Sequence, residues 1–449
     1  MKARFLFIVF LTICNNIIQA QTDTLFWFAV PYATTLHTAL TADINITATD
    51  EVNLTTVTIT QPYNPAITPI TVTIDPAISL TKTVSFTQAE LLLFSSNMYN
   101  SYDNSALLIR SDREITAYYE INKTLNNPSI FALKGQNAIG YDFWTPFQNQ
   151  WPNHVFGVSD PAFSQIIVVA TEPNTQVTIN FKKPANGYAI NTNYTITLQK
   201  GQTYMFVPPL IGGVPSTDPL DRLVGTHITS NKPISVTLND DSVQKVGAYD
   251  DMGDQLIPVT NVFGKSVIGH EYIVMKGMIY DTDIPSGNNE KAYVLTTQNN
   301  TRITITRRNG TSVTYGPYAA GYQLSVNLLV ANQDYYVHIN ADKPVYVMHV
   351  AGFGNELGNA ILPTIDGCTG SLSVSFTRSK ADLPPPGQAN KFYLNLMTKK
   401  DAIDSFYISI NGSNPVPFLT GADFEQAGTS EWYVLKDAKK LMNNATIPT

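Results

Sequence analysis

Cysteine is nearly absent from this chain of 449 residues, which contains only Cys14 and Cys368. Because Cys14 falls within the leader segment described below, a single cysteine is left and no internal disulfide can form. Charged residues are also scarce, at 14%, and the net charge is −7. Such a chain lacks the basic surface that neutralises phosphates, which argues against nucleic acid as a partner.

Long apolar runs are missing too, apart from a short one at the amino terminus. Two basic residues precede the apolar run Phe5–Ile13, and Ile18-Gln19-Ala20 resembles the cleavage site of a secretory signal. The run is shorter than the roughly 20 residues that a membrane-spanning helix needs. We therefore predict a signal peptide at residues 1–20, no transmembrane segment after its cleavage, and a secreted or cell-surface protein.

Hydrophobic residues, by contrast, make up 43% of the chain, and Thr, Asn, Val and Ile are common. Disordered chains combine high charge with low hydrophobicity, so this chain is expected to fold. Domains usually take about 100 to 200 residues, which predicts several domains here.

The chain also repeats itself. Ile228-Thr-Ser-Asn-Lys-Pro-Ile-Ser-Val recurs as Ile339-Asn-Ala-Asp-Lys-Pro-Val-Tyr-Val, and Ile109-Arg-Ser-Asp-Arg-Glu-Ile-Thr-Ala precedes both, at steps of 119 and 111 residues. Proline belongs at the first residue of a strand, after a turn made by Asn231 or Asp342, so this Lys-Pro motif predicts fold and not a site.

Two further motifs recur in the same order as the Lys-Pro motif. One is a short alternation that is typical of a strand, and the other is an apolar or aromatic pair that opens each repeat. The alternations are Val57-Thr-Ile59, Val177-Thr-Ile179, Ile303-Thr-Ile305 and Ile408-Ser-Ile410, and the openings are Phe26-Trp27, Phe143-Trp144, Tyr272-Ile273 and Phe392-Tyr393. Four openings but only three closings of the Lys-Pro type, the first of them with Arg113-Glu114 in place of Lys-Pro, predict a chain that stops inside a fourth repeat, with a C-terminal region missing.

Short β-branched and aromatic stretches bounded by Asn, Gly, Pro or Asp fill each repeat, with almost no helical periodicity. This pattern predicts an all-β protein of tandem antiparallel β-sandwich-like repeats, each about 115 residues long. A β-propeller with two blades in each repeat is the alternative. The predicted divisions are repeats at 21–137, 138–264 and 265–382, a proline-rich linker at 383–387, and a partial repeat at 388–449.

Several of these segments together resemble the IgGFc-binding protein N-terminal domain family. They are Gly140-Tyr-Asp-Phe-Trp, Gly269-His-Glu-Tyr-Ile-Val, Leu198-Gln-Lys-Gly-Gln-Thr-Tyr204, and the Lys-Pro motif at Ile228 followed by Asp254-Gln-Leu-Ile-Pro258. The resemblance implies a secreted, all-β, non-catalytic binding or adhesion module. It brings no residue-level binding motif, and the cysteine-rich character of the animal protein that names the family is absent here.

An acidic segment is the candidate metal site. Ca²⁺ takes several oxygen ligands, mostly carboxylates and carbonyls, and extracellular β modules often bind it at their ends. The five carboxylates belong to Asp240, Asp241, Asp250, Asp251 and Asp254. Their spacing is not that of a known Ca²⁺ loop, so a solvated acidic connection is the alternative.

An aromatic segment is the candidate ligand-binding platform. Large aromatic side chains contribute contact area at low entropic cost, and Phe143, Trp144, Phe147 and Trp151 form the densest aromatic stretch. The segment lies where the first repeat meets the second, so packing between repeats is the alternative.

The predicted function is therefore non-catalytic binding or adhesion, with an extracellular protein or a glycan as partner. Six histidines, from His37 to His349, are scattered without a catalytic signature, and no cofactor motif is present. A polysaccharide-active enzyme and a structural spacer of a larger surface protein are the alternatives.

Overall fold

The computed structural model describes residues 22–34, 41–87, 89–91, 99–122, 129–279, 290–328, 335–367, 395–408 and 414–435. The predicted signal peptide, Cys368, the linker 383–387 and the opening pair Phe392-Tyr393 lie outside these ranges. In the described residues the regular structure consists of strands and short 3-10 turns, so the all-β class is confirmed.

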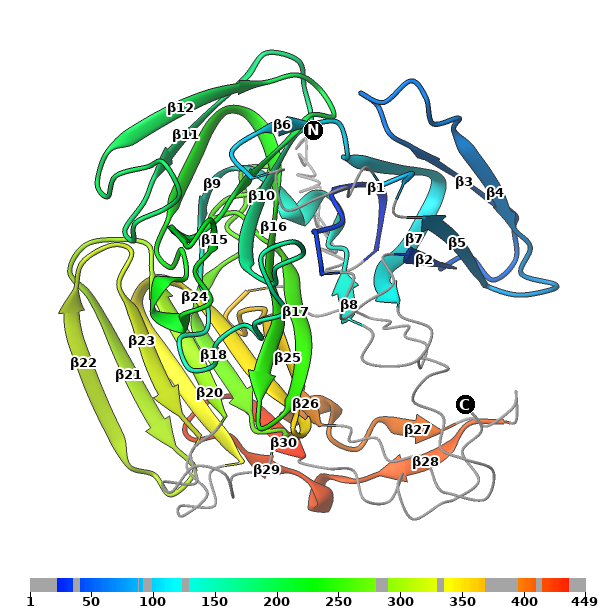
Figure 1. Cartoon of the computed structure of the whole chain (residues 1–449). Helices are drawn as coiled ribbons and strands as arrows, with labels where there is room; N and C mark the ends of the chain where they lie inside the picture. The colour runs from blue at the N-terminus through cyan, green and yellow to red at the C-terminus, as the bar shows by residue number, and fades with distance from the viewer. Residues whose placement is uncertain are drawn as a thin grey trace, which may run out of the picture.

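Three successive units share one topology (Figure 1). Unit 1 consists of β1 (Asp23–Phe28), β2 (Thr41–Ala48), β3 (Thr55–Thr60), β4 (Ile70–Ile74), β5 (Thr81–Thr87), β7 (Leu107–Asn122) and β8 (Ser129–Ala132). Unit 2 consists of β9 (Ile139–Trp144), β10 (Ser164–Ala170), β11 (Thr175–Asn180), β12 (Asn193–Leu198), β13 (Thr203–Phe206), β16 (His227–Lys245) and β17 (Ala248–Leu256). Unit 3 consists of β18 (Gly269–Met275), β20 (Lys291–Thr296), β21 (Thr301–Arg307), β22 (Ser312–Tyr318), β23 (Gln323–Asn327), β24 (Tyr336–Gly354) and β25 (Glu356–Ile361).

Smaller elements join or extend these units. They are β6 (Tyr102–Asp103), η1 (Gly135–Ala138), β14 (Leu210–Ile211), β15 (Val214–Pro215), η2 (Pro219–Asp221) and β19 (Met278–Ile279). The β6 strand comes from the chain of unit 1 but pairs with β13 of unit 2. The sheet of unit 2 therefore includes a strand from the chain of unit 1, and the division into separate domains stays a prediction.

One long strand organises each unit. The sheet orders are β4-β3-β7-β2-β5, β12-β11-β16-β10-β13 and β22-β21-β24-β20-β23, so β7, β16 and β24 hold equivalent places. The first part of β16 pairs with β9 and β11, whereas its second part pairs with β10 and β17. Because the long strand belongs to both layers, the sheet curls into a sandwich-like unit, in agreement with the first of the two predicted architectures.

The Lys-Pro motif lies where the long strand passes between the layers. The backbone N–H groups of Thr56, Gln176 and Arg302 donate to the side chains of Asp112, Asn231 and Asp342, each at 2.8 Å. The pairing of β9 with β16 jumps at this place, from Thr229 to Ile234. The prediction that Pro233 and Pro344 begin a strand is therefore wrong, because both lie inside a long strand, at a bulge.

Other side chains fix the same bulge in all three units. Thr49, Thr171 and Thr297 donate through Oγ1 to the carbonyl groups of Glu114, Pro233 and Pro344, at 2.7 to 2.8 Å. The basic residue of the motif contacts the turn that precedes the neighbouring strand of the sheet, β3 or β11. Lys232 Nζ donates to the Pro173 carbonyl at 2.6 Å, and Arg113 Nε donates to the Leu54 carbonyl at 3.1 Å. The motif thus indicates fold, as predicted from the sequence.

Apolar residues alternate along the strands and form cores inside and between the units. Unit 1 has its own core around Phe28 and Tyr119. A second core, which includes Trp27 and Phe163, joins units 1 and 2. The largest core is shared by units 2 and 3 and runs from Phe143 to Ile361. The units are therefore packed against one another through continuous apolar contacts.

A fourth group of elements packs against unit 3. It contains β26 (Leu396–Lys399), η4 (Lys400–Ala402), β27 (Phe406–Ile408), β28 (Val416–Leu419), η5 (Gly421–Asp423), β29 (Glu425–Gln426) and β30 (Trp432–Leu435). The pairs β26–β30 and β27–β28 repeat the pairings β20–β23 and β21–β22 of unit 3. Arg308 joins the two groups through Glu425, to whose carboxylate its Nε and one terminal nitrogen donate at 2.9 and 3.1 Å.

Removal of the side-chain acceptor at the bulge of unit 2, Asn231, should destabilise the protein. Asn231→Ala should lower the free energy of unfolding by about 1 kcal/mol, because the Gln176 N–H loses its partner. Asn231→Asp retains an acceptor oxygen and should stay close to the parent protein. Urea unfolding of both variants checks this, and equal losses from both would show that the acceptor is not what stabilises the bulge.

Candidate functional site

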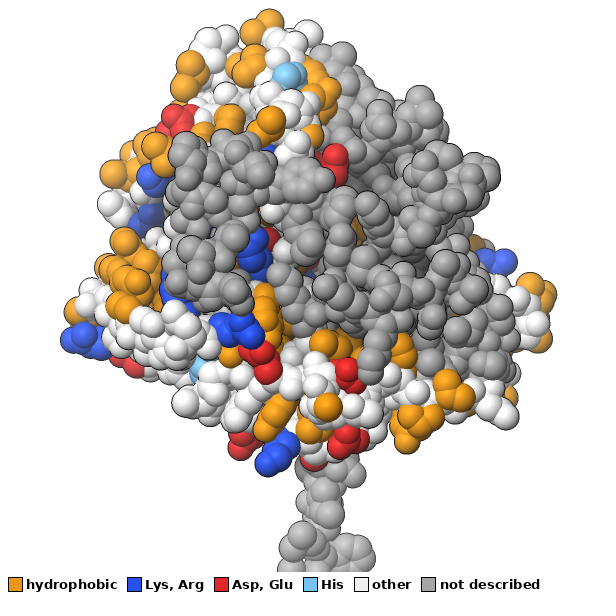
Figure 2. Space-filling view, turned by 90° about the horizontal axis from the view of Figure 1, so that it is seen from below, with side chains coloured by type: hydrophobic (Ala, Val, Ile, Leu, Met, Phe, Trp, Pro, Cys, Tyr) orange, Lys and Arg blue, Asp and Glu red, His pale blue; other side chains and the backbone are white. Residues whose placement is uncertain are grey.

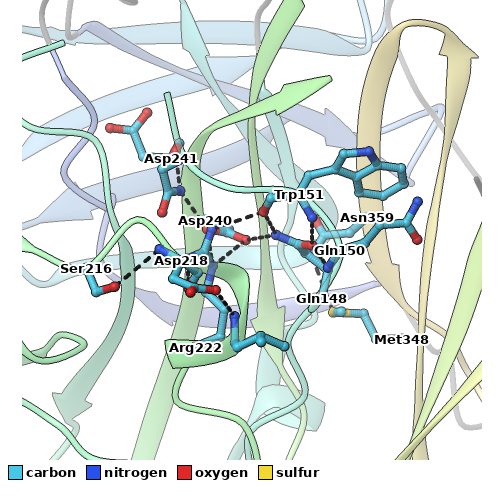
Figure 3. A network of polar contacts seen from close by, with 12 residues as sticks. Gln148, Gln150, Trp151, Ser216, Asp218, Arg222, Asp240, Asp241, Met348 and Asn359 are labelled. Atoms are coloured by element: carbon cyan, nitrogen blue, oxygen red, sulfur yellow. Dashed lines mark hydrogen bonds and ion pairs between the residues drawn. The ribbon is translucent and has the colours of Figure 1, made fainter. Parts of the chain in front are cut away.

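A buried ion pair lies at the centre of unit 2 (Figure 3). Arg222 and Asp240 are 1% and 3% exposed, and Arg222 Nε lies 2.9 Å from Asp240 Oδ1. Gln148 Nε2 and Asn153 Nδ2 also donate to the Asp240 carboxylate, at 2.9 and 2.8 Å. Such a pair is tolerated inside a protein only when further hydrogen bonds satisfy both charges, as they do here.

The same arginine ties two loops to β16. Its terminal nitrogens donate to the carbonyl groups of Asp218 at 2.9 Å and Trp151 at 3.3 Å. Gln148 folds back on its own loop, because Nε2 donates to the Trp151 carbonyl at 2.7 Å and Oε1 accepts from the Trp151 N–H at 2.9 Å. The sequence analysis missed Arg222, which no motif or spacing distinguishes from other arginines.

The aromatic stretch is held beneath this network. Phe143, Trp144, Phe147 and Trp151 are 0%, 7%, 3% and 6% exposed and belong to the core shared by units 2 and 3. Trp144 stacks on His227 with ring centroids 4.0 Å apart. Burial to this degree favours packing between units over the exposed platform considered from the sequence.

The five acidic residues lie on the hairpin formed by β16 and β17, and all are at most 6% exposed. The alternative of a solvated acidic connection is therefore wrong, because these residues are buried strand positions. Asp240 holds the loops of unit 2, while the other four face units 1 and 3. The hairpin is thus the part of the chain on which three units meet, as its central place in Figure 1 shows.

Three of these carboxylates bind neighbouring units directly. Asp241 Oδ2 accepts from the Thr34 N–H of unit 1 at 2.8 Å, and Asp254 Oδ1 lies 2.6 Å from Lys134 Nζ, beside β8. On the opposite side, the backbone N–H groups of Leu357 and Ile361 in β25 donate to Asp250 and Asp254, at 2.7 and 2.8 Å. Side-chain carboxylates therefore take the place of a backbone ladder between β17 and β25.

Burial changes the acidity of this cluster. The pKa of Asp241 is raised to about 7, chiefly by burial; the charges of Asp160 and Asp240 add to the rise, and hydrogen bonds from Thr34 and Ser242 oppose it. Burial also raises the pKa of Asp250, to about 8, with Glu356 adding to the effect and the Leu357 N–H opposing it. Within the described residues, no group of three or more His, Cys, Asp or Glu side chains is arranged to hold a metal ion. The calcium site stays a prediction from the sequence.

The outer end of the β16–β17 hairpin is exposed and apolar. Val246 is 62% exposed, and Val155 and Val158 in the adjoining loop are each 72% exposed. The loop is fastened to the hairpin, since the His154 N–H donates to the Ser242 carbonyl at 2.8 Å and the His154 ring stacks on Tyr249 at 4.6 Å. We call Val155, Val158 and Val246, with the rings of His154, Phe156 and Tyr249, the tip surface.

The hairpin turn itself is strained. Val246 and Gly247 join the paired residues Lys245 and Ala248, and their φ angles are 47° and 81°. Asn or Gly usually fills the first of these positions, because a β-branched residue with positive φ is an outlier. Strain at an exposed position is typical of functional sites.

The described histidines of unit 3 have structural partners. His338 Nε2 lies 2.7 Å from Glu271 Oε1, and His349 Nε2 lies 2.8 Å from Glu290 Oε1. Lys276 Nζ lies 3.6 Å from the other oxygen of Glu290, which is fully buried. These pairs join neighbouring strands of the sheet and its flanking segments.

The described part of the surface in Figure 2 carries no extended patch of a single charge sign. Over the described part of the face in Figure 2, basic and acidic side chains lie interspersed among hydrophobic ones. Within the described residues there is also no helix with the length and hydrophobicity needed to cross a membrane.

Comparison with known families decides where the chain belongs. A family model described as IgGFc binding protein matches residues 131–440. The chain belongs to this family, and the resemblance inferred from the sequence is confirmed. The IgGFc-binding match begins within β8, so most of unit 1 lies outside it, although unit 1 has the topology and the bulge contacts of units 2 and 3.

Other comparisons add little to the IgGFc-binding assignment. No curated protein gives a significant match. One solved structure, described as "Biofilm associated protein - BSP domain", aligns at 8% identity with a TM-score of 0.13, over 76% of this chain and 62% of that one. The chain thus spans less than two thirds of that protein's length, and a similarity this low carries no argument.

Truncation of the central arginine should be costly. Arg222→Ala leaves Asp240 charged and buried, which should lower the free energy of unfolding by roughly 3–5 kcal/mol. Arg113→Ala is the control, because it removes only exposed or partly exposed contacts, the pair with Asp50 and the hydrogen bond to the Leu54 carbonyl, which together should contribute roughly 1–2 kcal/mol. Urea unfolding measures both, and similar losses would contradict the structural role of Arg222.

Relief of the turn strain should have the opposite effect. Val246→Asn should raise the free energy of unfolding by about 1 kcal/mol, because Asn adopts left-handed backbone at lower cost than Val. Val52→Asn, at a position 83% exposed in unit 1, should leave stability nearly unchanged. Thermal unfolding of the two variants checks this, and a loss of stability in Val246→Asn would show that the turn is not strained.

Proposed function

We propose that this protein is a secreted, non-catalytic binding or adhesion protein that contacts an extracellular protein or a glycan through the tip surface. The observation that carries the proposal is the exposure of Val155, Val158 and Val246 around a strained turn. Membership of the IgGFc-binding family supports a binding role. Which partner is bound, and whether immunoglobulin Fc is among them, is decided by the experiment below.

The tip surface has the properties of a contact region. Complete burial of a valine side chain contributes about 1.5–3 kcal/mol, so three exposed valines offer a useful fraction of a binding free energy. The adjoining rings of His154, Phe156 and Tyr249 are packed against one another, with centroids 4.5 to 5.3 Å apart. Because the hairpin behind them is buried between units, the tip is held in place before a partner arrives.

Secretion is part of the proposal. The basic and apolar start of the chain supports export, with cleavage before Gln21. Amino-terminal sequencing of the protein from its culture medium tests this, and a chain that retains Met1 would contradict it.

The binding test uses the chain from Gln21 onward on an array of glycans and extracellular proteins that includes immunoglobulin G. The parent protein should give a saturable signal, and Val155→Asp/Val158→Asp should reduce it at least tenfold, because charge at the contact opposes desolvation. Chelator in a parallel series tests the predicted calcium site at Asp240 to Asp254.

The matched control is Val52→Asp/Ile78→Asp, which places two charges at exposed aliphatic positions of unit 1, 83% and 82% exposed. It should bind like the parent protein. Equal losses in both double variants would move the binding surface elsewhere. A blank array from folded protein would instead favour the spacer role, and release of sugars from the arrayed glycans would favour a polysaccharide-active enzyme.

A further inference from the structure

One carboxylate of the hairpin is buried without an ion pair or a well-formed hydrogen bond among the described residues. Asp251 is 5% exposed, and neither of its oxygens has a partner in hydrogen-bond geometry. The other four acidic residues of the hairpin each accept a hydrogen bond from a described residue. An isolated buried carboxylate is so unfavourable that it normally binds a proton instead.

Groups beside Asp251 can accept a hydrogen bond from its protonated carboxyl group. Asn239 lies opposite Gly253 on the paired strand, two residues from Asp251 along β17, and its Oδ1 is buried without a partner. Its Nδ2 is turned to the Tyr32 carbonyl, at 3.4 Å. On the side of unit 1, the Tyr119 hydroxyl is also buried and unpartnered.

The contact between β8 and β17 leaves no room for water to solvate a charge. A Cβ built on Gly253 would clash with Cε1 of Phe131, so the ring of Phe131 rests directly on the backbone of β17. Phe131 in turn stacks on Tyr119 at 4.7 Å. Hydration of an ionised Asp251 would therefore require unit 1 to move away from the hairpin.

Among the described residues, no cation forms an ion pair with Asp251. The titratable and charged groups that surround Asp251 include acidic residues of β16 and β17, a tyrosine of β7, and one lysine, which is bound to Asp254 at 2.6 Å. These groups are Asp240, Asp241, Asp254, Tyr119 and Lys134, with Asp160 and Tyr32 on the far side of Asp241. Burial raises the pKa of Asp251 well above its ordinary value; the charges of Asp241 and Asp240 add to the rise, and the nearby polar groups of Asn239 and Ser129 only partly oppose it.

We propose that Asp251 is a proton-operated lock between unit 1 and unit 2. The neutral acid donates its proton to Asn239 Oδ1 and the two units stay closed; loss of the proton releases β8 and Tyr119 from β17. The closed state binds one proton more than the open state, so opening becomes easier as the pH rises. Between the ordinary pKa of an aspartate, about 4, and the raised value, the opening constant should increase about tenfold per pH unit.

The test is hydrogen–deuterium exchange of the full mature chain, followed on peptides that cover 129–134 and 248–256. After correction for the intrinsic rate, these amides should exchange at least tenfold faster at about pH 8.5 than at about pH 5.5. Asp251→Asn imitates the neutral acid and should abolish this difference. Asp50→Asn, which changes an exposed acid of unit 1, should retain it.

Two results would overturn the lock. One is equal protection of the parent protein at both pH values, and the other is an undiminished pH response in Asp251→Asn, which would assign the response to another group such as Asp241. Should Asp251→Asn fail to fold, infrared spectroscopy of the variant Asp241→Asn/Asp250→Asn at neutral pH decides the matter, because this variant retains Asp251 and lacks the two other carboxyls of the hairpin with a pKa raised to about 7 and 8. A protonated carboxyl band that disappears at alkaline pH together with the protection supports the lock, and the absence of such a band refutes it.

Discussion

The three units depend on a single constraint: one strand in each must belong to both layers of its sandwich. The strand can do so only if it interrupts its pairing in the middle, and the bulge at Asp112, Asn231 or Asp342 makes that interruption. At the bulge, an acidic or amide side chain accepts the hydrogen bond from a backbone N–H that would otherwise pair with a strand carbonyl. A threonine hydroxyl donates to the carbonyl of the long strand that the bulge leaves unpaired. Proline suits the place because a ladder donor is not needed there. The layers, the shared core and the position of the β16–β17 hairpin all follow from this interruption.

Burial of acidic side chains is the second organising feature, and it divides the hairpin into functionally different parts. Near the core, the Asp240 carboxylate is compensated by Arg222, Gln148 and Asn153. Towards units 1 and 3, carboxylates are compensated by backbone N–H groups or by Lys134, except at Asp251. At the outer end, polar compensation gives way to exposed valines and stacked rings. One hairpin therefore fastens the units, senses protons and presents the proposed contact surface.

Much of the fold can be predicted from the sequence because it depends on local residue patterns. Alternating residues, turn residues and three recurring motifs indicated strands, repeats and the family. The place of the Lys-Pro motif was predicted wrongly, because Pro233 reads as a strand start unless the pairing of both flanking halves is known. The candidate sites were harder still. Burial of Trp151 and of Asp240 to Asp254 is decided by packing between units, which no local pattern records, and Arg222 meets Asp240 only after the chain has folded.

The carboxylate contacts between β17 and β25 have a consequence for how such arrays are assembled. Asp250 and Asp254 are four residues apart, and so are their partners Leu357 and Ile361, so the two strands run in the same direction with a constant offset. Four strand residues span about 13 Å, and both contacts form only if the spacings agree. The two acids thus fix how far unit 3 is displaced along the strand direction relative to unit 2. Insertion of a single residue between the two contact positions of either strand would make the spacings unequal, so the two contacts could no longer form at the same time.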